Sequence, residues 1–453
     1  MGSTNLYLPP EVHRILARYI NSQDIPNYRL LNKCCAEIGA EELFQTITFH
    51  CSGASIARVK AIKGNEHLRK QVKVAFWDAN YWRIPYVQGL PSWQDYFKEK
   101  SDSLRPWGSP EFETCHGAKL GQLAKNQQEW EAYVDKAKDE DQNRRIEVLH
   151  AALLGFENLR TILVLNGDLS QAHRGLEKWG DIVEYSANDE PVLLRGEGLH
   201  MDGPYIPDIY RPGAEALETL RMLPGLCLSK LSIDALCYTA FEEPINVAGT
   251  LDTLTSFHFR LTDRADGWNE YHEHFTTDNF SQMAQDVLSH GHLAEFLTRL
   301  VNLESLEVDL GEFCSDYRED SAIDSTADVI FPQDFTWPKL RMLSLRNFDS
   351  TPKRLLALLE RHSSTLKDLR FHHLHLELDT SVVGQEWGWR DVLQIICETL
   401  HLERATLSGW LSLTPERGEW FLDNGLAAPV ATYLVEGGEC PLNTGNAGRA
   451  GIR

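Results

Sequence analysis

A short apolar pattern that recurs along the second part of the chain is the feature that most restricts its fold. The pattern is Leu-x-x-apolar-x-apolar, and its last two apolar residues fall on one side of a β-strand because side chains alternate along a strand. It first occurs at Leu159, Ile162 and Val164. Further copies begin at Leu228, Leu254, Leu303, Leu340, Leu366 and Leu402. This recurrence predicts a repeated structural unit.

The spacing of the copies narrows the kind of repeat. Their starts are 69, 26, 49, 37, 26 and 36 residues apart. A spacing of 26 lies within the roughly 20–29 residues of a leucine-rich repeat, and the wider spacings require insertions. With 42% apolar residues, chance alone produces the pattern at about one start in fourteen. No copy has Asn or Cys three positions after the pattern, where a regular leucine-rich repeat places it, so we expect irregular repeats.

The segments between copies have the apolar spacing of helices. Phe280–Val301, Lys353–Leu359 and Val392–Leu400 are the clearest. A strand followed by a helix, repeated, builds a solenoid in which each unit buries its apolar face on its neighbours. The sequence therefore predicts an irregular α/β solenoid, similar to leucine-rich repeats, over residues 146–413. Beyond Pro415 the pattern is lost, so we expect a tail over 414–453 whose Gly- and Asn-rich end is unstructured.

The N-terminal fifty residues predict three short helices and a strand. Leu8-Pro9-Pro10-Glu11-Val12 opens a helix, since Pro suits a first helical turn. Its apolar residues recur on one helical face at Val12, Ile15, Leu16, Tyr19 and Ile20. Asp24 can cap a second helix through Ile25, Tyr28 and Leu31. A third helix over Ala36–Phe44 leads into the alternating strand Thr46–Phe49.

This arrangement resembles an F-box, in the variant common in fungal F-box-like proteins. The resemblance rests on the Leu-Pro-x-Glu-Val leader, on Asp24-Ile25 followed by Tyr28-Arg29-Leu30-Leu31-Asn32-Lys33, and on the Thr-Ile-Thr-Phe ending. F-boxes dock on the Skp-type adaptor of Skp–cullin–F-box ubiquitin ligases, so the resemblance implies a substrate receptor with a degenerate leucine-rich region. The residues that it assigns to the adaptor contact are Leu8, Pro9, Val12, Ile15, Ile25, Tyr28, Leu30 and Leu31.

Composition excludes several other classes of protein. The net charge of −22 repels phosphate backbones, and no Lys/Arg-rich run offsets it, so we expect no nucleic-acid partner. No stretch reaches the ~20 apolar residues of a membrane helix, and no secretory signal is expected. The nine Cys lack metal or disulfide-framework spacing. Reduced thiols in the cytoplasm or nucleus are the expected state.

The charge also bears on the protein partner. A chain of net charge −22 favours neutral or basic partners. The acidic stretch Glu312–Asp328 is the candidate local source of that field, and its alternative reading is a solvated loop that binds nothing.

The sequence contains only weak candidates for a catalytic or metal-binding site. The candidates are His372, His373, His375 and Glu377, then Tyr271-His272-Glu273-His274, then Cys115-His116. On a regular strand His373 and His375 would share one face and His372 the other. No second ligand pair stands at a zinc spacing, and no phosphate-binding glycine loop or nucleophile elbow occurs. We expect no metal, no cofactor and no enzymatic activity.

These observations together predict an α+β or α/β chain with four regions. They are an F-box-like domain at 6–50, a linker region with helices and an aromatic insertion at 51–145, the repeat region at 146–413 and the tail. The expected function is a substrate receptor that binds a Skp-type adaptor, and through it a cullin, and selects an unknown protein substrate with its repeats. The alternative is a non-catalytic repeat scaffold for protein–protein interaction whose F-box-like region is only a structural cap.

Overall fold

The computed structural model describes most of the predicted elements, in two compact units. The described residues are 8–20, 24–50, 53–78, 151–165, 217, 226–245, 251–262, 284–310, 329–377, 388–413 and 419–442. The N-terminal unit comprises Met1–Asn158 with Gly167–Pro207 and Asp266–Trp268, and the C-terminal unit holds the remainder of the chain. Within the described residues no helix has the length and apolar character needed to cross a bilayer.

The N-terminal unit begins with the predicted three helices and strand. These are α1 (Pro10–Ala17), α2 (Ile25–Tyr28), α3 (Lys33–Phe44) and β1 (Thr46–His50). The residues that follow form α4 (Gly53–Gly64), α5 (Glu66–Arg69) and β2 (Val74–Asp78), and β2 pairs with β1 in parallel. Helix α4 is separated from α5 at Asn65, whose side chain accepts hydrogen bonds from the amides of His67 and Leu68 and so starts α5.

The C-terminal unit is built on strands that pair in the order of the sequence. They are β3 (Thr161–Leu165), β4 (Lys230–Cys237), β5 (Ser256–Thr262), β6 (Ser305–Asp309), β7 (Met342–Ser350), β8 (Asp368–Leu376), β9 (Arg404–Leu413) and β10 (Glu419–Phe421). Each pairs with the next in parallel, except that β10 runs antiparallel to β9. The described chain is therefore mixed α/β, with mostly parallel strands.

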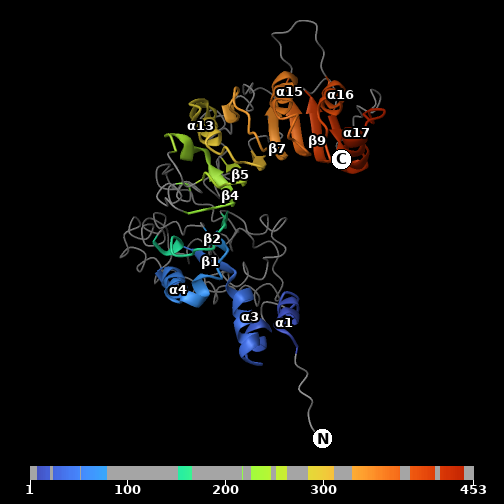
Figure 1. Cartoon of the computed structure of the whole chain (residues 1–453). Coiled ribbons are helices and arrows are strands. Elements are labelled where there is room, and N and C mark those ends of the chain that lie inside the picture. Colours follow the sequence, from blue (N-terminus) through green and yellow to red (C-terminus); the bar gives the residue numbers. More distant parts are fainter. Residues whose placement is uncertain are drawn as a thin grey trace, which may run out of the picture. The chain divides into compact units, whose positions relative to one another are not determined.

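The helices of this unit follow one another along the strands (Figure 1). They are α13 (His292–Thr298), α15 (Pro352–Arg361), α16 (Trp389–Thr399) and α17 (Ala427–Glu436), with 3₁₀ turns η7 (Tyr238–Phe241) and η9 (Leu422–Asn424). Thr351 caps α15 by accepting a hydrogen bond from the amide of Arg354, and Pro352 occupies the first turn. The sequence-predicted helices near 353 and 392 are thus confirmed.

The recurring apolar pattern marks the strands and sets their register. Leu306 of β6 lies opposite Phe257 of β5 on one side and Leu343 of β7 on the other. The same position continues through Leu369 to Ala405, and in the other direction through Leu231 to Ile162. All of the copies therefore align in a single row. That alignment confirms the prediction that the last two apolar residues of each copy lie on one side of a strand.

This apolar row is the core of the C-terminal unit. Leu306, Leu343 and Leu345 are completely buried. Helices cover the row: the ring of Phe257 on β5 packs on that of Phe296 on α13, with centroids 5.7 Å apart. Each leucine buried in this way contributes roughly 1.5–3 kcal/mol of hydrophobic free energy.

Two parts of the C-terminal unit differ from expectation. The run Phe280–Val301 is not one helix, because Gly291 adopts φ of 77° and separates a helix over 284–289 from α13. In the expected tail after residue 414, β10 and α17 are ordered, and Val430, Tyr433 and Leu434 of α17 are buried. The strand pattern does not predict α17, because no copy of the pattern lies beside this helix.

Several predictions fall on residues outside the described ranges. They are the aromatic insertion of the 51–145 region, Cys115-His116, Tyr271–His274, the acidic stretch Glu312–Asp328 and the last residues of the tail.

Candidate functional site

The three-helix module formed by α1, α2 and α3 carries the residues assigned to the adaptor contact. Ala17 of α1, Tyr28 of α2, and Cys35 and Ile38 of α3 form its small core, and Ile20 and Cys34 pack against them. The side chain of Asn32 starts α3 by accepting a hydrogen bond from the amide of Cys35 at 2.8 Å. The module thus closes on itself, and its core uses few of its large apolar side chains.

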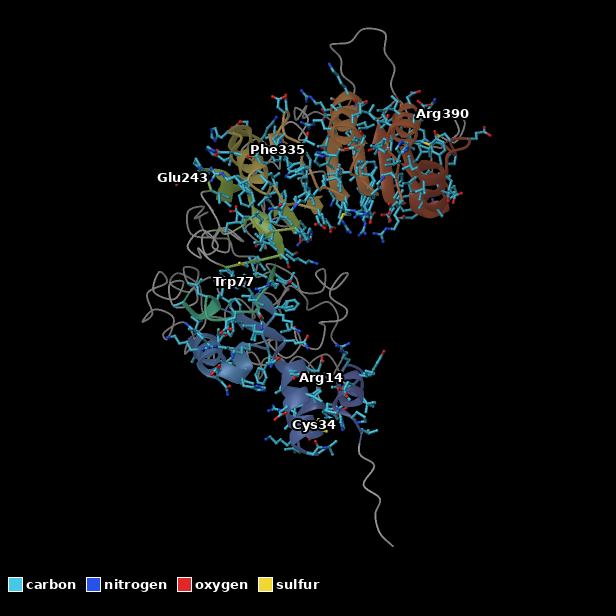
Figure 2. All side chains as sticks on the ribbon, viewed as in Figure 1. Arg14, Cys34, Trp77, Glu243, Phe335 and Arg390 are labelled. Atoms are coloured by element: carbon cyan, nitrogen blue, oxygen red, sulfur yellow. The ribbon has the colours of Figure 1, made fainter. Side chains whose placement is uncertain are left out.

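Polar contacts fix α1 against the rest of the module. Nδ1 of His13 lies 2.8 Å from the hydroxyl of Tyr28 and 3.6 Å from Sγ of Cys35. Burial, with the neighbouring Cys35 thiol, raises the pKa of Tyr28 above its usual range, so this hydroxyl stays protonated. Arg14 of α1 pairs with Glu41 of α3 at 3.3 Å (Figure 2 labels Arg14 and Cys34). The orientation of α1, and with it the set of side chains that α1 exposes, is therefore defined.

The side chains that the module exposes are unusually apolar. Of the nine large apolar side chains that are exposed among the described residues, five belong to this module. On α1 and just after it they are Ile15 at 55%, Leu16 at 42% and Tyr19 at 86% exposure. After α2 they are Leu30 at 83% and Leu31 at 69%. This concentration of exposed apolar side chains makes the module a candidate surface for binding another protein.

The assigned adaptor residues divide into exposed, half-buried and core positions. Pro9, Ile15, Leu30 and Leu31 are exposed, while Leu8 and Val12 are half-buried. Ile25 and Tyr28 are buried at 5% and 9% exposure, and they support the module from inside. Because Ile25 and Tyr28 are buried, the surface that a partner can reach consists of the four exposed residues and the exposed parts of Leu8 and Val12.

Sequence reasoning missed two members of this surface. Leu16 and Tyr19 share the apolar spacing of α1, but the residues of that stretch assigned to the adaptor contact are Val12 and Ile15. In the structure Ala17 makes the buried contact of α1 instead. The sequence indicates this packing through Ala17, a small residue among larger apolar ones, since a small side chain permits close approach of two helices.

The C-terminal unit presents a second candidate surface, the polar face of its strands. Residues that alternate with the buried row point away from it, and on β6 to β9 they pair across strands. Arg346 of β7 lies 2.9 Å from Glu307 of β6, and Asn347 lies 2.8 Å from Asp309. We call this the outward face of the sheet. It is charged and hydrogen-bonded, which suits binding to a polar polypeptide.

The histidines of β8 lie on the outward face, but differently from the prediction. His373 adopts φ of 51°, and the strand bulges there, so Leu374 rather than His373 continues the buried row opposite Phe348. As a result His372 and His375 share the outward face, and each lies 2.8 Å from a serine of β9, Ser408 and Ser412 respectively. The ring of His373 lies beside that of His372, with centroids 4.2 Å apart. The prediction that His372 lies on the opposite face from His375 is therefore wrong, because alternation shifts by one residue at the bulge.

These histidines have the environment of structural side chains. Partial burial lowers the pKa of His372, with the neighbouring His373 and Arg346 adding to the effect. Among the residues that the structure describes, no three His, Cys, Asp or Glu side chains are grouped so that they could hold a metal ion. Nδ1 of His372 and Nδ1 of His375 each have a serine hydroxyl as hydrogen-bonding partner.

Comparison with known proteins adds no family to this description. No protein-family model matches the chain, and no curated protein matches it either.

Proposed function

We propose that this chain is the substrate receptor of a Skp–cullin–F-box type ubiquitin ligase. In this proposal the module of α1 to α3 is an F-box-like domain that docks on the Skp-type adaptor, and the C-terminal unit is an irregular leucine-rich-repeat solenoid that holds a protein substrate. The single observation that supports adaptor docking best is the exposure of Ile15, Leu16, Tyr19, Leu30 and Leu31 on a module that already has its own core.

Exposure of these apolar side chains has a cost in hydrophobic free energy for the isolated chain. A leucine side chain gains roughly 1.5–3 kcal/mol when it is fully removed from water, and that gain is not realised while the side chain stays exposed. A partner that covers several of these residues recovers it on binding. Few interface residues carry most of the affinity of a complex, and large apolar side chains in the centre are typical of them.

The solenoid assignment is supported by the aligned register of the strands. Every copy of the apolar pattern from Leu159 to Leu402 leads into a strand that pairs with the next, and helices lie between successive later strands. Stacked repeats of this kind give each unit a neighbour on which to bury its apolar side. Under this proposal the chain acts by proximity, raising the effective concentration of substrate beside the ubiquitin-loaded enzyme, and it needs no catalytic residues.

Adaptor docking is tested by the double variant Leu30→Ser and Leu31→Ser. Both side chains are more than two-thirds exposed, so their loss leaves the core of the module intact. We expect copurification of the adaptor and cullin with the full-length chain to fall at least tenfold, the equivalent of about 1.4 kcal/mol. The measurement is a pull-down with quantitative blotting of both partners.

The matched control is Leu154→Ser, another exposed leucine of the N-terminal unit at 47% exposure. It should retain adaptor binding. Circular dichroism of all variants checks that they fold. If the wild-type chain captures neither adaptor nor cullin, the scaffold alternative, in which the module is only a cap, replaces the receptor proposal.

A further inference from the structure

We propose that the outward face of β8 and β9 binds an acidic polypeptide segment. This inference rests on the proposed function, since it names the class of substrate that the repeat half would select. The residues that carry it are Asp368 and Arg370 of β8 and Arg404 of β9, which we call the Asp368 cluster.

The Asp368 cluster is a buried carboxylate that holds two exposed guanidinium groups. Asp368 is 4% exposed. Arg370 donates to both of its oxygens, from Nε at 3.2 Å and from Nη2 at 2.8 Å, and Nη2 of Arg404 forms an ion pair with Oδ2 at 2.9 Å. The arginine side chains are 41% and 73% exposed, against 6% for that of the aspartate. Two cations on one anion leave a net positive charge, and the solvent meets the cationic side of the cluster.

The two guanidinium groups keep donors for a second anion. An arginine has five N–H donors in a planar fork, and Asp368 occupies only part of each set. The contacts with Asp368 also restrict the arginine side chains before any ligand arrives, so less conformational entropy is lost on binding. Carboxylates are the anions that this fork geometry fits, and a polypeptide lying across the strands supplies them as Asp and Glu side chains.

The third arginine of this face extends the cation row across the sheet. Register places Arg346 of β7 opposite His372, two residues further along β8 than Arg370. Arg404, Arg370 and Arg346 therefore lie on a diagonal over three adjacent strands, with neighbours about 7–8 Å apart at the backbone. Arg346 is already paired with Glu307, whose side chain is 22% exposed against 41% for the arginine. Within β8 and β9 themselves Arg370 and Arg404 outnumber Asp368, whereas Glu307 and Asp309 of β6 face Arg346 and Asn347.

The local charge outweighs the total charge for a ligand in contact with this face. The whole chain has a net charge of −22, which alone favours a basic partner. At physiological ionic strength, however, charges more than about 8 Å away are largely screened. An acidic side chain bound at the Asp368 cluster therefore responds mainly to Arg370 and Arg404. The distant carboxylates slow its approach and have less influence on the bound state.

The test measures binding of labelled peptides to the full chain in the absence of adaptor, with fluorescence anisotropy as the readout. Three labelled peptides of equal length are compared, built on Gly and Ser with interspersed Glu, Gln or Lys. We expect the Glu peptide to bind most tightly and to weaken as salt is raised. Arg404→Gln should weaken it, and the triple variant Asp368→Asn, Arg370→Gln and Arg404→Gln should do so by about tenfold or more. The triple variant removes the cluster without leaving a buried charge unpaired.

Arg390→Gln is the matched control, because Arg390 is an exposed arginine on α16 of the same unit (Figure 2). It should retain wild-type affinity for the Glu peptide. The inference is overturned if the Gln or Lys peptide binds as tightly as the Glu peptide, or if the triple variant binds like wild type. Because no adaptor is present, this outcome is independent of whether the N-terminal module docks on one.

Discussion

His362 is a buried titratable residue inside the C-terminal unit. Its side chain is completely buried at the end of α15, and its ring stacks on Trp337 with centroids 5.4 Å apart. Trp337 is itself held by donating from Nε1 to the carbonyl oxygen of Leu297 on α13. Burial, with the adjacent Arg361, lowers the pKa of His362 to about 4 from 6.5. The folded protein therefore holds this imidazole neutral in conditions where the unfolded chain protonates it.

This difference makes the stability of the unit depend on pH. The folded pKa lies below the unfolded one, so the unfolded state binds the extra proton between about pH 6.5 and 4. Stability attributable to His362 is complete above pH 6.5 and is lost as pH falls towards 4. From pH 7.5 to 5.0 the expected loss in unfolding free energy is on the order of 2 kcal/mol.

Comparison of wild type with His362→Phe isolates this effect, because Phe keeps a ring against Trp337 and does not titrate. Urea unfolding, monitored by tryptophan fluorescence at pH 7.5 and at pH 5.0, gives the free energy of unfolding of each protein at each pH. We expect the wild-type stability to fall with acid by about 2 kcal/mol more than that of the variant. Parallel pH dependence of the two proteins would contradict the assignment.

The strands of the C-terminal unit show what local sequence can determine. Alternation within Leu-x-x-apolar-x-apolar predicted which side of each strand is buried, because period-2 patterning is a local property. Beyond the β-bulges, alternation no longer predicts which side chains are buried. Asn347, His373 and Gly409 all adopt positive φ, at 50°, 51° and 70°, and beyond Gly409 it is Leu411 that enters the core, while Trp410 is 38% exposed. Only the pairing with a neighbouring strand reveals such a shift.

The buried leucines of β6 and β7 give a direct measure of the repeat core. Leu306→Ala and Leu343→Ala should each destabilise the unit by about 2–5 kcal/mol, because each removes a completely buried side chain from between neighbouring strands and leaves a cavity. The measurement is chemical denaturation of the full chain. Val301→Ala, at 45% exposure, is the control and should change stability by less than about 0.5 kcal/mol. Losses below about 1 kcal/mol at both leucines would mean that the row is not a packed core.

The N-terminal module shows the limit of apolar patterning for locating a binding surface. The spacing of Val12, Ile15, Leu16 and Tyr19 predicted a helix correctly, and α1 begins and ends near the expected residues. Spacing does not distinguish a face that packs on the chain's own core from one that stays open, since both need apolar side chains in a stripe. That distinction came from the burial of Ala17 and the exposure of Tyr19.

The chain as a whole divides its two proposed binding tasks between its two compact units. The exposed apolar residues around Leu30 lie in the N-terminal unit, and the Asp368 cluster lies in the C-terminal unit. Each unit has a core of its own, with Tyr28 and Cys35 in one and the leucine row in the other. A surface substitution in one unit should therefore leave the folding of the other unchanged.

This division predicts that the two losses are independent. Leu30→Ser with Leu31→Ser should abolish adaptor capture and leave the affinity for the acidic peptide within about twofold of wild type, whereas the triple variant of the Asp368 cluster should do the reverse. Combining both sets should reproduce each loss in its own assay, with the change in peptide-binding free energy within about 0.5 kcal/mol of that of the triple variant alone, as expected for sites that share no partners. The measurements are adaptor pull-down and peptide anisotropy on the same four proteins. A peptide affinity that changes with the Leu30 and Leu31 substitutions would show instead that the N-terminal module influences the outward face. The two binding surfaces would then be coupled.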